Sequence, residues 1–222
     1  MDDDVLLPRF TSCGRTCVYV LPCRDEDVLK VGYSRDPLQR MRSLHRRFFE
    51  FFDLDRGLLI EAERLRDARR IERRFIGQFA AQRVPPPLVV RDAATGYTEW
   101  FRGVSPQADA LARALCAEEG LILHALRPWL RARLEERSDS LYAWSERMLE
   151  ALEYEHFNLP AEARRGILAK ALRDTLDACA AVGLDLAGRV PPAVLEWHAA
   201  HDYFGRCRPR TARAACARRT GP

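Results

Sequence analysis

Glu72 is the residue whose type and position say most about chemistry. It follows Ala68 by four residues and precedes Phe75 and Phe79 by three and seven, a spacing that places it in the middle of the apolar face of a helix. A buried carboxylate is costly unless it pairs with a cationic side chain, takes up a proton or binds a metal ion. The same helix offers four cationic partners, Arg69, Arg70, Arg73 and Arg74. From this helix alone, a structural ion pair and a metal ligand are equally consistent with Glu72.

A run of basic residues forms a second group that could do chemistry. Its arginines, with Asp36 as the only acid among them, are Arg35, Arg40, Arg42, Arg46 and Arg47. Guanidinium groups match phosphate oxygens, so this surface could bind DNA, and Arg40 lies where its stem can pack while its head reaches a cleft. A solvated helix face is the alternative, because Lys30 and Lys170 are the only lysines among 36 basic residues and arginine is abundant throughout the chain.

The elements that must position these groups begin with two short β-prone runs. Residues 17–21 and 28–33 are joined by a polar turn and predict a hairpin. Asp36 and Pro37 are typical of an N-cap and a first helical residue. The helix that they predict carries its apolar residues at helical spacing, namely Leu38, Met41, Leu44 and Phe48.

A strand and a long helix are expected next. Residues 58–60 predict the strand, and residues 61–79, which include Glu72, predict the helix. Three prolines at 85–87 end it, and the runs 88–90 and 97–101 predict a second hairpin.

The second half of the chain has helical periodicity. The helices that it predicts span 106–119, 121–136, 140–156, 161–181 and 192–204. We therefore expect an α/β (α+β) fold with a small mixed sheet and flanking helices, followed by an all-helical region. The expected divisions are an N-terminal extension (1–15), an α/β domain (16–104), a helical domain (105–204) and a basic tail, disordered when free (205–222).

Composition excludes several classes of protein. The 222 residues are 47% hydrophobic and 31% charged, as in globular proteins. Three aspartates follow Met1 where a secretory leader would be basic, and no apolar run approaches the ~20 residues that span a bilayer. These features predict no membrane partner. Because the chain has seven cysteines, an odd number, and no CxxC pair, we expect a reducing compartment and a cytoplasmic protein. Zinc is not expected, because finger spacing is absent from the candidate ligands Cys13, Cys17, Cys23, His198, His201, Cys207 and Cys216.

Taken in order, these features resemble the GIY-YIG nuclease superfamily. Val18-Tyr19-Val20 looks like its first motif, and Lys30-Val31-Gly32 stands in the place of its second. Arg40 lies eight residues after Gly32 on the next predicted helix, and Glu72 lies on the later one. The segments most similar to a phage-associated branch described as DNA-binding are 30–34, 71–72 and 99–101. The resemblance covers roughly residues 16–104.

The resemblance implies hydrolysis of DNA phosphodiester bonds assisted by one divalent ion, Mg²⁺ or Mn²⁺. Glu72 would be the metal ligand, since a hard carboxylate suits either ion. Arg40 would oppose the negative charge that develops on the phosphate. Tyr19 would activate or position the attacking water.

One position departs from the family pattern, because Lys30 stands where the second motif has a tyrosine. Tyr33 comes three residues later and would point to the opposite face of a strand. A lysine can bind phosphate or, when burial lowers its pKa, act as a base. It is equally consistent with a domain that binds DNA and cuts poorly.

Three functions are therefore consistent with the sequence. The leading hypothesis is a metal-dependent DNA endonuclease, and the second is a DNA-binding module of the same fold that has lost efficient cleavage. The third is a helical platform for oligomerisation or for an unidentified protein partner.

Overall fold

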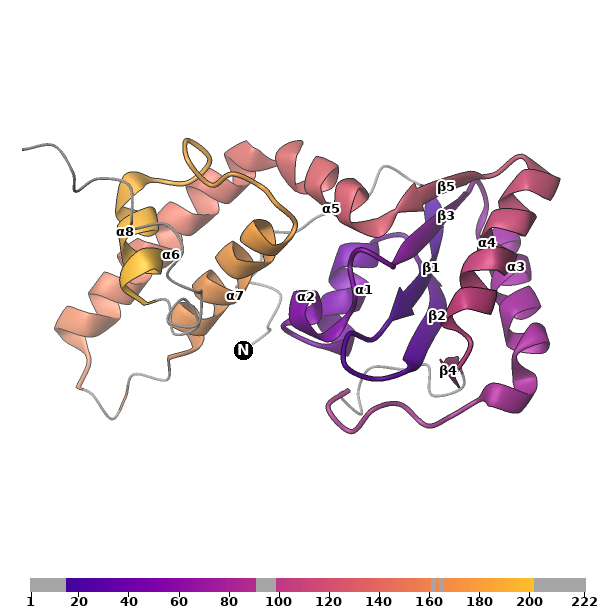
Figure 1. The fold of residues 1–222 in the computed structure, drawn as a ribbon. Helices are drawn as coiled ribbons and strands as arrows, with labels where there is room; N and C mark the ends of the chain where they lie inside the picture. The colour runs from indigo at the N-terminus through magenta and orange to yellow at the C-terminus, as the bar shows by residue number, and fades with distance from the viewer. Residues whose placement is uncertain (1–14, 91–98, 161–162, 164–165, 202–222) are drawn as a thin grey trace, which may run out of the picture.

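The computed structural model describes residues 15–90, 99–160, 163 and 166–201 (Figure 1). Its centre is a five-stranded sheet in the order β4-β2-β1-β3-β5, in which every pairing is antiparallel. The strands are β1 (Thr16–Pro22), β2 (Val28–Ser34), β3 (Leu58–Ala62), β4 (Trp100–Arg102) and β5 (Ile122–Ala125). The α/β fold class with flanking helices and a helical C-terminal region is confirmed, although the strands run antiparallel rather than in mixed directions.

The predicted first hairpin is confirmed, and its register sets the geometry of the site. Tyr19 of β1 lies opposite Gly32 of β2, and Leu21 lies opposite Lys30. Successive side chains on a strand point to opposite faces. Tyr19, Lys30 and Gly32 therefore share one face of the sheet, and Tyr33 lies on the other.

Helices cover both faces of the sheet, so β1 is buried along its whole length. One face packs against α1 (Pro37–Leu44) and α2 (Phe48–Phe51) through residues such as Leu38 and Phe48. The other packs against α3 (Leu65–Gln78) and α4 (Ser105–Glu119) through residues such as Phe75 and Ala112. Figure 1 shows the two helix pairs on opposite sides of the strands.

The start of α1 follows the predicted capping pattern. The side chain of Asp36 accepts a hydrogen bond from the Gln39 backbone N–H at 2.9 Å, and Pro37 occupies the first turn. Leu38, Met41 and Leu44 are buried as expected. The helix ends at Leu44, and the next short helix begins at Phe48.

Two predicted elements of the first half are corrected. Strand β3 extends to Ala62, so α3 begins at Leu65 rather than at residue 61, and a short 3-10 helix, η2 (Ala80–Gln82), follows it. The second hairpin is wrong as predicted, because residues 88–90 form a turn with Leu88 fully exposed. Strand β4 instead pairs with β2. Residues 91–98, which lie between the turn at 88–90 and Glu99, are outside the described residues.

The sheet unit also extends past the expected boundary at residue 104. Helix α4 packs on the sheet, and residues 122–125, predicted as helix, form strand β5 paired with β3. β-branched Ile122 and the cross-strand hydrogen bonds favour the strand here. Helix α5 (Leu126–Glu135) then leads away from the sheet.

The helical region comprises α5, α6 (Ser138–Asn158), α7 (Ile167–Ala181) and α8 (Pro192–Ala200). Its core is continuous with that of the α1 face, since Leu172 and Trp144 belong to the same buried cluster as Met41. The expected extension and basic tail lie almost entirely outside the described residues. Within the described part, no helix is both long and apolar enough to cross a membrane.

Candidate functional site

Tyr19 and Gly32 pack against each other at the centre of the candidate site. The Tyr19 ring lies across Gly32, and a Cβ added to Gly32 would stand 2.3 Å from the Tyr19 hydroxyl oxygen. Glycine is therefore required here by close approach. Arg40 of α1 donates from Nε to the Tyr19 hydroxyl at 3.3 Å. Burial raises the pKa of Tyr19 and the Arg40 charge opposes this shift, so the hydroxyl stays protonated at neutral pH.

Lys30 is a buried cation on the same face. Its side chain is 1% exposed, and Nζ donates to Glu99 Oε2 at 2.7 Å. Nζ also lies 5.5 Å from the centre of the Trp100 ring. Burial lowers the pKa of Lys30, whereas the hydrogen bond and charge of Glu99 raise it. Glu99 is fixed from its backbone, because its carbonyl accepts from the Val31 N–H at 3.0 Å.

Glu72 lies at the margin of the buried face of α3 and is partly buried, not in the middle of that face as the spacing predicts, because Ile71 takes the buried position. Its pKa is raised to about 7, first by desolvation and then by the negative charge of Glu99, with Lys30 opposing the shift. Of the arginines proposed as ion-pair partners, Arg70 binds Glu119 at 2.6 Å and Arg69 donates to the Tyr33 hydroxyl at 3.1 Å. Among the described residues Glu72 makes no hydrogen bond or ion pair, so the salt-bridge alternative is not observed.

Residues from both faces of the sheet meet at the outer edge of β2. Lys30 faces α1, whereas Glu72 comes from α3 on the opposite side. Strand β4 starts at Trp100, opposite Lys30, and the Val31 N–H continues the pairing by donating to the Glu99 carbonyl. The charge of Glu99 raises the pKa of both Glu72 and Lys30, so the three charges lie within electrostatic reach of one another.

The structure thus brings together all four residues predicted for catalysis, Tyr19, Lys30, Arg40 and Glu72. It adds Glu99, which lies in one of the segments similar to the phage-associated branch and to which the sequence assigns no role. The sequence feature that could have indicated a role for Glu99 is its position directly before the apolar residues Trp100 and Phe101. Tyr33 lies away from Tyr19, as the strand periodicity predicts, and contacts Arg69 instead.

The arginines predicted to bind DNA divide into two pairs. Arg35 is exposed and Arg46 is half-buried. Arg47 does not face outward as predicted, because its guanidinium binds Asp174 at 2.7 Å and Asp177 at 2.9 Å on α7. The pKa of Arg42 is lowered by burial, with Cys179 and Asp174 of α7 close to it. Arg42 and Arg47 therefore lie between the sheet unit and the helical region.

The donor set fits a divalent ion of the magnesium type. In the part of the chain that the structure describes, no group of three or more histidine, cysteine, aspartate or glutamate side chains gathers as a metal cage. Magnesium, however, is commonly held by one or two carboxylates together with waters and substrate phosphates. Glu72 and Glu99 supply two mutually repelling carboxylates, whose repulsion a cation would relieve.

The zinc candidates lie in other surroundings. Cys17 and Cys23 are buried in the core, and burial raises the pKa of their thiols to about 11 and about 12. His198 Nε2 lies 2.8 Å from Asp177 Oδ1. Cys13, Cys207 and Cys216 lie outside the described residues.

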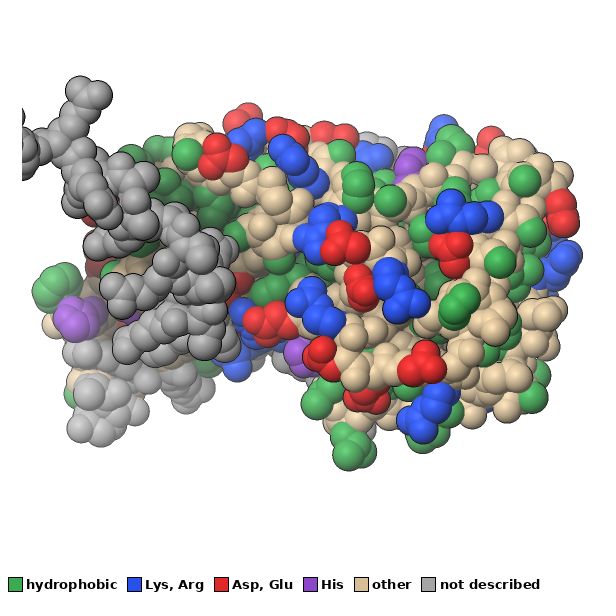
Figure 2. Space-filling model, viewed as in Figure 1, with side chains coloured by type: hydrophobic (Ala, Val, Ile, Leu, Met, Phe, Trp, Pro, Cys, Tyr) green, Lys and Arg blue, Asp and Glu red, His purple; other side chains and the backbone are tan. Residues whose placement is uncertain are grey.

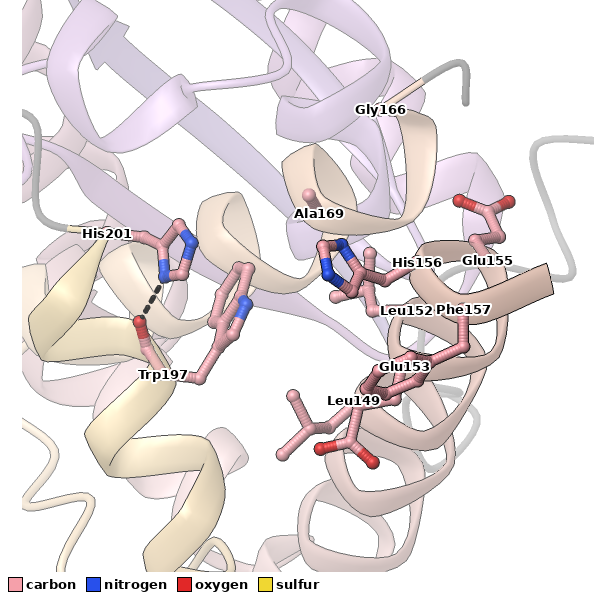
Figure 3. A pocket seen from close by; sticks show the side chains of 10 residues that line it. All are labelled: Leu149, Leu152, Glu153, Glu155, His156, Phe157, Gly166, Ala169, Trp197 and His201. Carbon is pink, nitrogen blue, oxygen red and sulfur yellow. Dashed lines mark hydrogen bonds between the residues drawn. The ribbon is translucent and has the colours of Figure 1, made fainter. Parts of the chain in front are cut away.

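A pocket of different character lies in the helical region (Figure 3). It is lined mainly by apolar side chains of α6 and α8, including Leu149, Phe157 and Trp197. His201, at its edge, bonds through Nδ1 to the Trp197 carbonyl at 2.8 Å. None of the residues predicted for catalysis lines it.

Known proteins offer one point of comparison. No curated protein and no solved structure matches the chain. One family model matches slightly less than half of the chain. The matched part includes every residue of the candidate site, namely Tyr19, Lys30, Arg40, Glu72 and Glu99. Residues 16–116 are similar to the T5orf172 domain, a phage-type module associated with nucleases and DNA binding.

Proposed function

We propose that this chain is a metal-dependent DNA endonuclease. Its site would lie beside β2 and contain Tyr19, Lys30, Arg40 and Glu72. The observation that carries the proposal is the partly buried Glu72 carboxylate, which has no ion-pair partner among the described residues and lies near a tyrosine and an arginine. This combination suits phosphodiester hydrolysis, in which negative charge develops on the phosphate. The match of residues 16–116 to the T5orf172 domain supports the same class of function.

Each side chain has a role that its surroundings favour. Arg40 holds a phosphate oxygen through its guanidinium, while Nε stays on the Tyr19 hydroxyl. Tyr19 keeps its proton at neutral pH, so it orients the attacking water rather than deprotonating it. Glu72 would hold Mg²⁺ or Mn²⁺, and the bound ion would polarise the phosphate and lower the pKa of water.

DNA would approach from the side of the sheet edge where Arg35 is exposed. The face shown in Figure 2 has basic and acidic side chains interspersed and no broad basic patch, so it lacks the features of an extended DNA-binding surface. We expect the contact with DNA to centre on Arg35, Arg40 and Arg46.

A DNA-binding module without efficient cleavage is the second candidate. The observation that favours it is the ion pair of Lys30 with Glu99, which fills the place of the second-motif tyrosine. Such a module would bind DNA with an affinity that falls as salt rises, without turnover.

Metal-dependent cleavage separates the two candidates. Supercoiled plasmid and short single-stranded, duplex and branched DNAs are incubated with the full chain and Mg²⁺ or Mn²⁺, and binding is measured on the same samples. Cleavage that requires metal, is lost in Glu72→Gln and persists in the exposed control Glu63→Gln supports the endonuclease. Binding without cleavage by any variant supports the module. Neither activity, with a stable homo-oligomer, would favour the helical platform.

A further inference from the structure

Arginines line the outer side of α3. Ala68 and Phe75 mark the buried side of this helix. At about 3.6 residues per turn, Arg66 and Arg73 lie opposite them, and Arg69 lies beside the line that joins these two arginines. All three arginine side chains are exposed. We call these three residues the arginine track.

The arginine track has little acidic compensation within the described residues. The two acids of α3 lie on either side of it. Arg66 Nε is 3.9 Å from Asp67 Oδ1, at the outer limit of an ion pair. Arg73 makes no hydrogen bond or ion pair with the described residues. On the side that faces α4, by contrast, Arg70 binds Glu119 at 2.6 Å. The positive charge of α3 is therefore neutralised toward α4 and retained along the track.

This arrangement does not serve the stability of the helix. Residues three or four apart on a helix are neighbours, and like charges at that spacing destabilise it. Arg66 and Arg69 are three residues apart, and Arg69 and Arg73 are four apart. Arginine is abundant throughout the chain, but abundance alone leaves unexplained why no acid interrupts this line. A basic stripe along one helix is typical of a surface that binds a polyanion, which relieves the repulsion.

Tyr33 of β2 orients the middle arginine of the track. Arg69 donates from Nε to the Tyr33 hydroxyl at 3.1 Å, and its guanidinium carbon lies 6.0 Å from the centre of the Tyr33 ring. This hydrogen bond uses one of the five guanidinium donors, so the two terminal nitrogens can still bind phosphate oxygens. Glu72 follows Arg69 by three residues, which makes them neighbours on the helix surface. The arginine track therefore runs beside the candidate site.

We propose that the arginine track binds the phosphate backbone of DNA beside Glu72, through charge and without regard to base sequence. The proposal rests on the proposed function, which supplies DNA as the ligand. It adds a second contact surface, on the α3 side of the sheet, to the one that Arg40 provides on the α1 side.

Binding of a short fluorescent duplex to the full chain, followed by anisotropy in EDTA, tests this without metal or cleavage. Each phosphate contact contributes about 0.9 to the slope of log affinity against log salt. Arg66→Gln/Arg73→Gln should therefore flatten this slope by about 2 and weaken binding about tenfold or more at about 100 mM salt. Arg69 is left unchanged in this variant to keep its hydrogen bond to β2.

The matched control is Arg131→Gln/Arg147→Gln. It removes the same charge from two exposed helical positions, on α5 and α6, away from the sheet. Its salt slope and affinity should stay close to those of the wild type. A slope that flattens as much in this control as in Arg66→Gln/Arg73→Gln would reflect net charge alone and would overturn the proposal.

Two further measurements separate DNA contact from an effect on folding. Arg66→Lys/Arg73→Lys keeps the charge and should keep the salt slope of the wild type. Without DNA at low salt, Arg66→Gln/Arg73→Gln should melt at or above the wild-type Tm, because it relieves like-charge repulsion and glutamine forms helix about as well as arginine. Weaker DNA binding by a variant with an equal or higher Tm supports the proposal. A variant that melts well below the wild type would instead assign the track to the fold and overturn it.

Failure of this proposal is distinguishable from failure of the proposed function. If the wild type binds DNA and the glutamine variant of the track binds it equally well, only the track is refuted. If binding depends on the track but no condition gives cleavage, the track stands and the endonuclease is refuted. If the wild type binds no DNA even at low salt, both are refuted. Displacement of the duplex by polyglutamate at equal charge concentration would overturn DNA as the ligand in favour of an acidic protein.

Discussion

Replacing Glu72 by glutamine should stabilise the metal-free protein at alkaline pH, although it removes a residue that we assign to the site. Burial and the charge of Glu99 raise the pKa of Glu72 from 4.5 to about 7. The folded chain therefore holds this proton more tightly than the unfolded chain. Its contribution to stability is complete below pH 4.5 and is lost as the pH rises to about 7. Glutamine cannot ionise, so the variant escapes this loss.

The magnitude follows from the shift in pKa. One pKa unit corresponds to 1.36 kcal/mol, so the full shift from 4.5 to about 7 is worth at most about 3.4 kcal/mol well above pH 7. Glu72 is only partly buried and water screens its charge, so we expect roughly 1–2 kcal/mol. For a chain of this size, about 1 kcal/mol moves the Tm by roughly 2–4 °C. Glutamine forfeits no hydrogen bond or ion pair that Glu72 makes within the described residues.

Urea unfolding in EDTA at pH 5 and pH 8.5 measures the effect. Glu72→Gln should exceed the wild type in free energy of unfolding at pH 8.5, and its advantage should shrink markedly at pH 5. Glu63→Gln, at an exposed position, should show no such change with pH. Added Mn²⁺ should reduce the advantage at pH 8.5, since it stabilises the wild type alone. An advantage of equal size at both pH values, or a less stable variant at pH 8.5, would refute the reasoning.

Other positions give direct tests of the fold. Gly32→Ala should lower the free energy of unfolding in urea by about 1–3 kcal/mol, because its Cβ would lie 2.3 Å from the Tyr19 hydroxyl oxygen. Adding Tyr19→Phe to the same chain should recover part of that loss. An unchanged unfolding midpoint in Gly32→Ala would contradict the close approach. Arg47→Met should lower the free energy of unfolding by about 2 kcal/mol or more, because Asp174 is 8% exposed and would lose its ion pair with Arg47. Limited proteolysis should then cleave the variant faster than the wild type near α2 and α7, and equal rates would contradict this role of the ion pair. Asp36→Ala should cost about 1 kcal/mol in thermal melts through loss of the α1 cap, whereas a loss near zero would mean that the cap contributes nothing.

Local interactions explain what could be predicted from the sequence. The first hairpin, the capped start of α1 and the helices α4 and α6 depend on residues close together in the chain, and the structure contains them near their expected limits, whereas α5 and α7 begin five and six residues later than expected. The grouping of Tyr19, Arg40 and Glu72 in one site is what the resemblance to the GIY-YIG superfamily implies, through the order and spacing of its motifs.

Long-range pairing decided the rest. Residues 122–125 have helical neighbours, yet they form β5 because β3 offers an unpaired edge, and β4 pairs with β2 from about 70 positions away in the chain. Arg47 reads as one more basic residue until α7 brings Asp174 and Asp177 to it. Glu99 becomes part of the site for the same reason, since only the pairing of β4 with β2 places its carboxylate on Lys30. The sequence by itself determined the local elements and the types of side chain available for chemistry. Tertiary structure decided which of those side chains share a site, because contacts between distant segments depend on packing that no local pattern encodes.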